Sequence, residues 1–599
     1  MAGHASRLDV RNWGDLALTT EPLLDAPTED LNSAAPSLLF LLAITCAVML
    51  AGAMAALYGL HFTPHFGIDD ANITHIYARN IAQGFGYVFN RGGEHVEGST
   101  SPLWTAVNTV VFLVPGPKPW ELLALSTLTT AATVFFSLVL ATDLAGVFKV
   151  EKRLAAVVSA ILLASTPTFF AWNVWSLLDI APWCLECMLL VLVASRLARQ
   201  STAASLAQGA ALTLLAVAAT VTRPEAIVIV GFVLLMTAAW VALGRTDGWK
   251  RLLVMFAVAI AASVAASLLL TLWREAYFGY PLPNTYYAKV SSNHLAALAP
   301  GIAYIIRAAS KMPVFLLGFA AWLVLAISLL RAGAGVPLRE RLYSLAPMVP
   351  LLAMAAAVLG VTILEGGDHF SDQRFLQPLT PLLAMGMGIC GLWLVHRYWA
   401  GAARHRVALA SLVAILGVLF FATTALWYRH YQASIEREFV ISNRGRAFGA
   451  ILNDVVQKEG PASVGVIAAG GLPMVFHGKA YDLEGLNWVA MAHANPIKVG
   501  PQDHASFDAA TFYAAHPDFI VLDYYSFAPS QRWVVGAFHV QALKGVLLEK
   551  KFQAEYSPVL VDIDGKTIGV IASDDWIAHA KTKAFKVLPW SDLTFLTQL

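Results

Sequence analysis

The chain has 599 residues, of which 58% are hydrophobic and only 13% are charged, and its mean hydropathy is +0.63. A soluble domain carries about 25% charged residues, so the composition excludes a soluble globular protein. The formal net charge of +1 gives no support for a nucleic-acid partner. All four cysteines fall inside apolar blocks, which predicts inert thiols in membrane helices.

Residues 1–35 are polar and show no helical periodicity, so we expect a flexible cytoplasmic tail. The first apolar block lacks a small-residue cleavage site, which predicts an anchor and not a cleaved signal peptide. Eleven apolar blocks are about as long as a membrane crossing. They run at 37–60, 119–147, 154–172, 181–198, 205–222, 226–244, 251–272, 312–330, 343–363, 375–395 and 407–427. A further apolar stretch, 104–115, is too short to cross and predicts a helix at the membrane interface.

Basic residues gather in alternate loops between these blocks, and the positive-inside rule makes those loops cytoplasmic. They are Lys149, Lys152, Arg153, Arg196, Arg199, Arg245, Lys250, Arg251, Arg331, Arg339, Arg341, Arg397, Arg404 and Arg406. The first long loop, 61–118, and everything after 428 then lie outside. We expect a multi-pass membrane protein with a membrane domain at 36–427 and an outer domain at 428–599.

The composition changes after Tyr428. Residues 432–457 have the pattern of an amphipathic helix, and short apolar runs follow at 463–468, 519–525 and 566–572. Helical and strand periods alternate, which predicts a small α/β domain. The predicted fold class is therefore a mainly α, polytopic helical bundle with an extracytoplasmic α/β domain.

Two adjacent carboxylates, Asp69 and Asp70, follow the first predicted span. Their mutual repulsion and partial burial should raise at least one pKa, which suits a general base acting on a hydroxyl group. The alternative is a solvated loop or a cap on the helix that follows. On that helix His75 and Arg79 share one face, and Arg79 either holds a phosphate or pairs with an aspartate.

The later outside loops carry further polar groups. Arg223 lies in Thr222-Arg-Pro-Glu225, where an interfacial ion pair is the simpler interpretation. The loop 277–294 supplies Tyr286, Tyr287 and Lys289, which fit an aromatic belt or a phosphate-binding lysine.

The loop 364–378 holds five charged or titratable side chains within ten residues, which is costly unless they line a cavity. They are Glu365, Asp368, His369, Asp372 and Arg374. Asp368, His369 and Asp372 could hold a metal ion, but their spacing is irregular. We expect Arg374 to face a phosphate.

Taken together, these motifs resemble the GT-C superfamily of polyprenyl-phosphate-sugar-dependent glycosyltransferases. They are most similar to the terminal arabinofuranosyltransferases of mycobacterial cell-wall arabinan and related bacterial enzymes. The motifs are Asp69-Asp-Ala-x-Ile73, Tyr77-Ala-Arg-Asn80, Gly84-x-Gly-x-Val-Phe-Asn90, Glu97-Gly-x-Thr-Ser-Pro-Leu-Trp104, Thr222-Arg-Pro-Glu225, Pro283-Asn-Thr-Tyr-Tyr-Ala-Lys289, Gly367-Asp368 with Arg374-Phe375 and Pro378, and Tyr481-Asp-Leu-Glu-Gly-Leu-Asn487. Asn72 stands where the family often has an aromatic residue.

The resemblance implies a GT-C fold and an inverting transfer from a polyprenyl-phosphate sugar, arabinofuranose favoured, to a glycan, glycolipid or glycoprotein acceptor. It also implies a bacterial inner (plasma) membrane, with the transfer on its extracytoplasmic side. Asp69 would be the base, with Asp70 second. Arg79, Lys289 and Arg374 would hold the donor phosphate. The pocket would be lined by His75, Arg223, Tyr286, Tyr287, Asp368 and His369. The resemblance requires no metal ion or cofactor.

Two other functions remain open at this point. A transporter or flippase of a lipid-linked glycan usually shows inverted repeats and charges within its spans, and the sequence shows neither clearly. A non-catalytic scaffold would have little use for so many polar groups in the outside loops.

Overall fold

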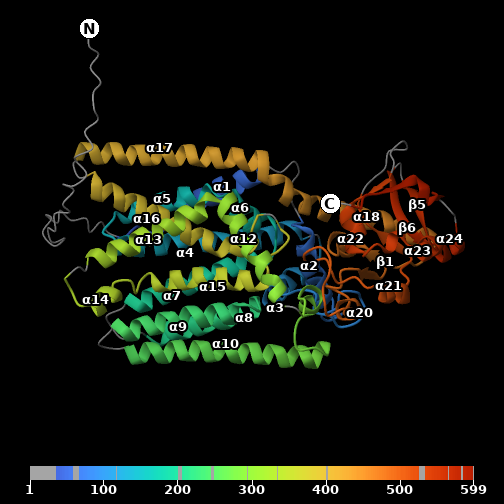
Figure 1. Cartoon of the computed structure of the whole chain (residues 1–599), viewed down its shortest axis with the longest axis horizontal. Coiled ribbons are helices and arrows are strands. Elements are labelled where there is room, and N and C mark those ends of the chain that lie inside the picture. The colour runs from blue at the N-terminus through green and yellow to red at the C-terminus, as the bar shows by residue number, and fades with distance from the viewer. Residues whose placement is uncertain are drawn as a thin grey trace, which may run out of the picture.

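The computed structural model describes residues 35–597, apart from 59–65, 117, 200–204, 245–248, 293, 333–334, 371, 400–401, 525–532, 564–565 and 582–584. The expected tail and the start of the first loop, 61–65, therefore lie outside the described residues. Figure 1 shows a bundle of long helices and, at one end of it, a smaller domain that contains the strands. We call the part from residue 432 onward the C-terminal domain and its boundary with the bundle the junction.

Each of the eleven predicted spans coincides with a helix or a bent pair of helices. They are α1 (Leu38–Tyr58), α4 (Pro119–Val147), α5 (Lys152–Ala164) with α6 (Pro167–Phe170) and η1 (Ala171–Trp175), α7 (Ile180–Arg199), α8 (Leu206–Thr222), α9 (Ala226–Gly244), α10 (Trp249–Phe278), α13 (Pro313–Ala332), α15 (Val349–Glu365), α16 (Thr380–Tyr398) and α17 (Ala402–Leu426).

The predicted count of about eleven spans is higher than the structure supports by length. Within the described residues eight helices are long and apolar enough to cross a membrane, or nine if the pair bent by 76° after α5 forms one span. The bend follows from Pro167, which cannot donate a backbone hydrogen bond to continue α5. α8 and α15 are apolar but have only 17 residues each. The mainly helical, multi-pass membrane fold is confirmed.

Shorter helices line the junction and the opposite end. They are α2 (Asp69–Ala82), α3 (Pro102–Phe112), α11 (Asn284–Lys289), η2 (His294–Ala297), α12 (Leu298–Lys311), α14 (Leu338–Tyr343) and η3 (Arg374–Leu379). α3 is the short helix expected at 104–115. It begins where Ser101 accepts a hydrogen bond from the Trp104 N–H and Pro102 occupies the first turn.

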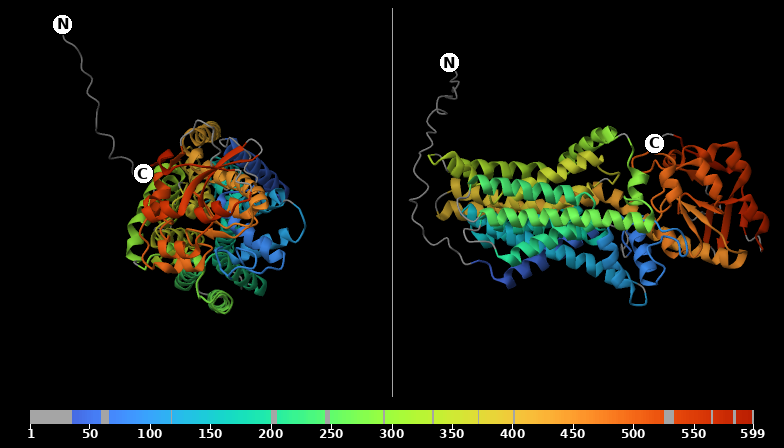
Figure 2. Two further views of the ribbon diagram at one scale, coloured as in Figure 1. Left: turned by 90° about the vertical axis from the view of Figure 1, so that its right-hand side faces the viewer. Right: turned by 90° about the horizontal axis from the view of Figure 1, so that it is seen from below.

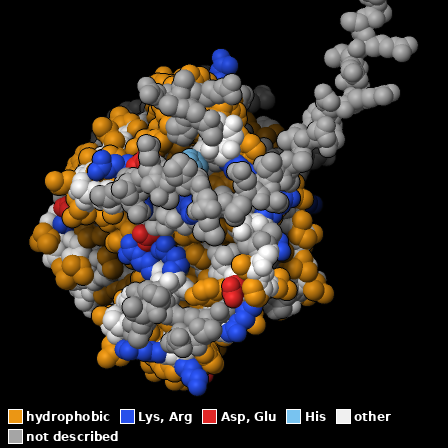
Figure 3. Space-filling view, turned by 90° about the vertical axis from the view of Figure 1, so that its left-hand side faces the viewer, with side chains coloured by type: hydrophobic (Ala, Val, Ile, Leu, Met, Phe, Trp, Pro, Cys, Tyr) orange, Lys and Arg blue, Asp and Glu red, His pale blue; other side chains and the backbone are white. Residues whose placement is uncertain are grey.

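Figure 3 shows the end of the bundle that lies opposite the C-terminal domain. Lys and Arg side chains gather there among hydrophobic ones, and few acidic side chains are visible. α14, which carries Arg339 and Arg341, lies at this end in Figure 1. This clustering agrees with the loops that the positive-inside rule makes cytoplasmic.

The C-terminal domain begins with α18 (Gln432–Glu459), the predicted amphipathic helix, which continues from η4 (Trp427–Tyr431). Its six-stranded sheet has the order β2-β1-β3-β6-β5-β7. The parallel part pairs β1 (Val464–Val466) with β2 (Ala480–Asp482) and β3 (Phe519–Val521). The antiparallel part adds β6 (Lys566–Ser573), β5 (Tyr556–Ile563) and β7 (Phe585–Val587). The predicted runs at 463–468, 519–525 and 566–572 contain β1, β3 and β6, so the α/β prediction is confirmed.

The remaining elements of this domain are short. β4 (Trp533–Val535) and β8 (Leu593–Phe595) form a separate parallel pair. The helices are α19 (Gly471–Val475), α20 (Val489–Ala494), α21 (Ala509–Ala515), α22 (Ala537–Ala542), η5 (Val546–Leu548), α23 (Lys550–Glu555), α24 (Asp574–His579) and η6 (Trp590–Asp592).

The first loop shares a hydrophobic core with the C-terminal domain. Ile73 and Ile76 of α2 pack in one buried cluster with Leu452, Val464 and Phe519. Figure 2 shows the first loop in blue against the orange and red C-terminal domain. The predicted boundary at 427/428 stays a prediction, because the core continues across the junction.

Side-chain amides connect the two parts of this core. Asn90 donates to the Ala480 carbonyl at 2.9 Å and accepts from the Ala480 N–H at 2.8 Å, so it extends β2 as a strand would. Tyr77 donates to Asn487 at 2.9 Å, and Asn284 donates to the Gly485 carbonyl at 2.7 Å.

A buried ion pair connects the first loop to the bundle. Arg274, near the end of α10, donates to both oxygens of Glu97 at 2.6 and 2.9 Å. Both side chains are almost fully buried. A bidentate pair of this kind fixes position and orientation together, so it holds the first loop to α10.

Candidate functional site at the junction

The two adjacent aspartates have different environments. Asp69 is buried, and its two carboxylate oxygens accept the backbone N–H groups of Gly470 and Gly471 at 2.9 and 2.7 Å. The alternative in which an aspartate caps its own helix is wrong, because Ile68 is the cap residue and makes no side-chain bond. Asp69 instead ties α2 to the loop before α19, 401 residues further along the chain.

Burial raises the pKa of Asp69 to about 7, and the charge of Asp70 adds to the rise, although the two N–H groups oppose it. Its hydrogen-bonding capacity is largely used inside the protein. Asp69 is therefore poorly placed to reach an outside hydroxyl.

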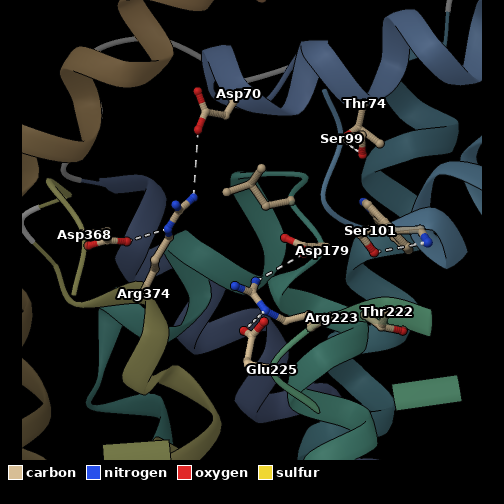
Figure 4. A network of polar contacts seen from close by, with 12 residues as sticks. Asp70, Thr74, Ser99, Ser101, Asp179, Thr222, Arg223, Glu225, Asp368 and Arg374 are labelled. Carbon is tan, nitrogen blue, oxygen red and sulfur yellow. Dashed lines mark hydrogen bonds and ion pairs between the residues drawn. The ribbon is translucent and has the colours of Figure 1, made fainter. Parts of the chain in front are cut away.

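Asp70 has a more open environment. Its side chain is 31% exposed, and Oδ2 lies 4.0 Å from Nη1 of Arg374. This distance permits electrostatic attraction but is too long for a hydrogen bond. Figure 4 shows the Arg374 guanidinium between Asp70 and Asp368.

Arg374 is held in place from several sides. Its Nε donates to Asp368 at 2.5 Å, and Asp368 is buried. The guanidinium also packs on the rings of Phe370 and Phe375, at 4.3 and 5.2 Å from their centroids. A guanidinium held in this way offers fixed donors to an anion.

A second arginine lies one layer deeper in the bundle. Arg223 donates to Asp179 at 3.2 Å and also pairs with Glu225. Its charge lies 5.4 Å from the ring of Phe375, so the two arginines share that ring. The side chain of Arg223 is only 12% exposed. The expected ion pair is therefore present, but it lies inside the protein and not at the membrane interface.

The site continues onto the C-terminal domain through histidines. Nδ1 of His369 lies 3.1 Å from Asp503, whose other contact is the His369 N–H at 3.2 Å. Burial opposes ionisation of Asp503, but the bond from His369 and the charge of Lys289 hold its pKa below the usual range. The next residue, His504, lies with its ring 4.8 Å from that of His369 and its Nδ1 3.9 Å from Glu484.

The structure therefore brings Asp70, Asp368, His369, Arg374 and Lys289 to one region. Lys289 is near enough for its charge to affect the pKa of Asp503, Glu484 and His504. Tyr287 packs on His493 with centroids 4.1 Å apart, and Tyr286 meets Tyr287 edge-on. Both tyrosines thus lie where α11 contacts α20.

Two predicted site residues face elsewhere. Arg79 donates to the backbone carbonyl of Met474, in α19. His75 is buried with its ring 6.2 Å from Phe112, and burial, followed by the charge of Arg446, lowers its pKa to about 3. No contact among the described residues joins either of them to Asp70 or Arg374.

Sequence reasoning missed several members of the site. Asp179, Glu438, Asp503 and His504 lie outside the quoted motifs, and Glu484 was noticed only as part of a short motif. Burial raises the pKa of Glu438, on α18, to about 7, with Asp70 among the charges that raise it. Among these residues only Glu484 had a signal in the sequence, because it lies two positions after Asp482 within one short motif.

The possible metal ligands of the 364–378 loop are engaged with protein groups. Asp368 pairs with Arg374, and His369 pairs with Asp503. Across the residues that the structure describes, no group of three or more His, Cys, Asp or Glu side chains could hold a metal ion.

Comparison with known proteins identifies a solved structure of similar fold. No family model matches the chain, and no curated protein matches it. Among solved structures, the crystal structure of ArnT from Cupriavidus metallidurans bound to undecaprenyl phosphate matches with a TM-score of 0.50 and 14% identity. The match covers 89% of this chain and 98% of that one. This chain therefore has an ArnT-like fold, in which the bundle and the C-terminal domain are both included.

Proposed function

We propose that this chain is an inverting GT-C glycosyltransferase that moves a sugar, arabinofuranose favoured, from polyprenyl phosphate to a cell-envelope glycan, glycolipid or glycoprotein. The observation that carries the proposal is the partly exposed Asp70 carboxylate facing Arg374 across 4.0 Å. The fold supports it, since the ArnT structure of similar fold was solved bound to undecaprenyl phosphate, which is a polyprenyl phosphate. The junction would lie on the outer face of a bacterial plasma membrane.

In this mechanism Asp70 is the base. It takes the proton of an acceptor hydroxyl while that oxygen attacks the anomeric carbon of the donor, and the bond from that carbon to the phosphate oxygen breaks. The phosphate leaves with the electron pair. We assign the base to Asp70 and not to Asp69 because both Asp69 oxygens already accept backbone N–H groups.

Arg374 stabilises the leaving phosphate. Negative charge grows on the phosphate as the bond breaks, and a prepositioned guanidinium lowers the energy of that state. Asp368, Phe370 and Phe375 hold Arg374 before the substrate arrives. Lys289 is a second cation for the same region, whereas Arg79 is left out because Met474 occupies it.

The test is transfer from synthetic polyprenyl-phosphoryl-arabinofuranose to a panel of glycan acceptors, with release of polyprenyl phosphate as the readout. Asp70→Asn should lower kcat by about 1,000-fold or more, because an amide cannot take the proton. Asp69→Asn is the matched control and should keep measurable transfer. Equal loss in both variants would contradict the assignment of the base.

Donors with aminoarabinose and mannose test the sugar. If arabinofuranose is ignored and another donor is used, the class stands and the sugar is wrong. If no donor is consumed although the purified protein binds these lipids, the transferase is wrong and a transporter of lipid-linked glycans takes its place.

A further inference from the structure

Glu484 lies just after β2 and has an unusual environment. Its side chain is only 2% exposed, yet neither carboxyl oxygen has a hydrogen-bond partner among the described residues. Leaving a buried carboxyl without partners costs several kcal/mol, roughly. Groups like this in folded proteins are usually explained by a ligand or an ordered water.

His504 faces Glu484 with a second orphaned atom. Its Nδ1 is also without a hydrogen-bond partner in the part of the chain described, and it lies 3.9 Å from Oε2 of Glu484. That separation is too long for a direct hydrogen bond. A single oxygen atom between the two, at about 2.8 Å from each, can bond both of them. A hydroxyl group, which both donates and accepts, fits this position.

Aromatic rings lie beside the Glu484–His504 pair. The His504 ring meets Phe538 edge-on at 5.0 Å and lies 4.8 Å from the His369 ring. Small-molecule sites are usually lined by apolar and aromatic groups with a few placed polar atoms. A sugar ring has the same two aspects, since its C–H groups are apolar and its hydroxyls are polar.

The charge state of the pair favours a neutral ligand. Burial, followed by the charge of Asp482, raises the pKa of Glu484 well above its usual range. Burial, followed by the charge of His369, lowers the pKa of His504 to about 3. Both shifts oppose charge on the pair, which favours hydroxyl groups over a phosphate as the ligand.

Contacts connect this gap to the proposed base. Asp503, next to His504, bonds His369, and Arg374 packs on the neighbouring Phe370. The charge of Asp70 also acts on His504 and on Asp482, so all of them share the junction. Glu484 and His504 themselves belong to the C-terminal domain and meet the 364–378 loop where the His504 ring lies against His369.

We propose that Glu484 and His504 form a subsite that binds hydroxyl groups of the glycan acceptor beside Asp70. This assignment rests on the proposed glycosyl transfer and adds its acceptor-binding residues. The donor sugar presents the same hydroxyl chemistry, so the experiment includes an arm for each source.

The experiment uses the full-length protein with Glu484→Gln and His504→Phe. The first keeps the size of the side chain but replaces one carboxyl oxygen, which accepts a hydrogen bond, with an amide NH2 group, which cannot. The second removes both ring nitrogens and keeps an aromatic ring against Phe538. The matched control is His516→Phe with Glu555→Gln, a His–Glu pair of the same domain separated by 3.8 Å but 34% exposed on each side.

With a linear hexa-arabinofuranoside as acceptor, KM for the acceptor should rise about tenfold or more in both site variants, because each loses a buried hydrogen bond. The affinity for undecaprenyl phosphate, which has no sugar, should stay within about twofold in all variants. The control pair should behave as wild type. An unchanged acceptor KM in both site variants overturns the proposal, and so does a rise in the donor KM alone.

A second measurement separates this inference from the transferase itself. Saturation-transfer NMR reports binding of the free hexa-arabinofuranoside, or of a hexamannoside, without any donor. If no donor is consumed but the oligosaccharide binds and Glu484→Gln abolishes binding, the subsite stands and the proposed reaction is wrong. If transfer proceeds and Glu484→Gln binds oligosaccharide as wild type does, the subsite is wrong and the reaction stands. His504→Phe is interpreted only if its thermal midpoint matches the control.

Discussion

The two arginines that share the Phe375 ring differ in the number of carboxylates that they bond. Arg223 bonds two carboxylates, Asp179 and Glu225, and all three side chains are nearly buried. Arg374 bonds one buried carboxylate, Asp368, while Asp70 stays at 4.0 Å and is 31% exposed. Figure 4 shows both clusters in one view.

The difference separates a structural ion cluster from a site that can accept a ligand. Two bonded carboxylates, one on Nε and one on Nη1, more than balance the single charge of Arg223, so it attracts an outside anion less than Arg374 does. Arg374 has only one bonded carboxylate and a neighbour held at a distance. An anionic group that enters between Arg374 and Asp70 would therefore meet a cation whose position is already fixed.

The strongest way to break this comparison is Arg223→Gln. It leaves Asp179 and Glu225 facing each other without a cation, and loss of one partner of a buried ion pair costs about 3–5 kcal/mol. We expect a large fall in the thermal unfolding midpoint of the purified protein, measured by intrinsic fluorescence. Arg196→Gln, at a 46% exposed pair with Asp143, is the control and should change little. A normal midpoint for Arg223→Gln would contradict the structural role.

Arg374→Gln tests the proposed role of Arg374 as the cation that meets the ligand. We expect kcat to fall about 100-fold, because one prepositioned donor to the developing charge is lost. The thermal midpoint should fall less than in Arg223→Gln, since the glutamine amide can still donate to Asp368 and Asp70 is reached by water. Steady-state kinetics and the same unfolding assay measure both effects. A variant that unfolds but keeps its kcat would reverse the two roles.

Arg374→Lys sharpens the comparison further. Lysine keeps the charge but lacks the planar fork, so it cannot hold Asp368 and face Asp70 in the same fixed geometry. We expect a loss in kcat of about tenfold, between wild type and the glutamine variant. A kcat equal to that of the glutamine variant would show that geometry alone matters.

The last test concerns the pH dependence of stability that Asp69 contributes. Its pKa is about 7 in the folded protein and 3.8 as an unperturbed group, so between these values the folded state holds a proton that the unfolded state has lost. Stability should therefore fall as pH rises from about 4 to about 7 and level off above. Asp69→Asn should flatten this slope by one proton relative to wild type, as measured by unfolding midpoints across that range. An identical slope in both proteins would contradict the buried state of Asp69.

The sequence predicted the fold well because apolar length is a local property. All eleven apolar blocks and the helix at 432–457 became helices, and only Pro167 bent one of them unexpectedly. The short strands β2 and β5 gave no clear signal, since three to eight residues of alternating pattern are easily hidden between turns.

The sequence could not order Asp69 and Asp70, because the answer depends on Gly470 and Gly471, about 400 residues away. The same holds for Arg223, whose partner Asp179 lies 44 residues earlier. Residue type indicated which side chains carry charge. Only tertiary packing decides which of them are already neutralised by a partner.

The side-chain hydrogen bonds across the junction also affect how this protein can be engineered. Asn90, Asn284, Tyr77 and Asp69 each bond the C-terminal domain from the bundle side. A chimera that exchanges only the C-terminal domain between two proteins of this fold would mismatch all four. The exchangeable unit is the C-terminal domain together with the first loop and α11.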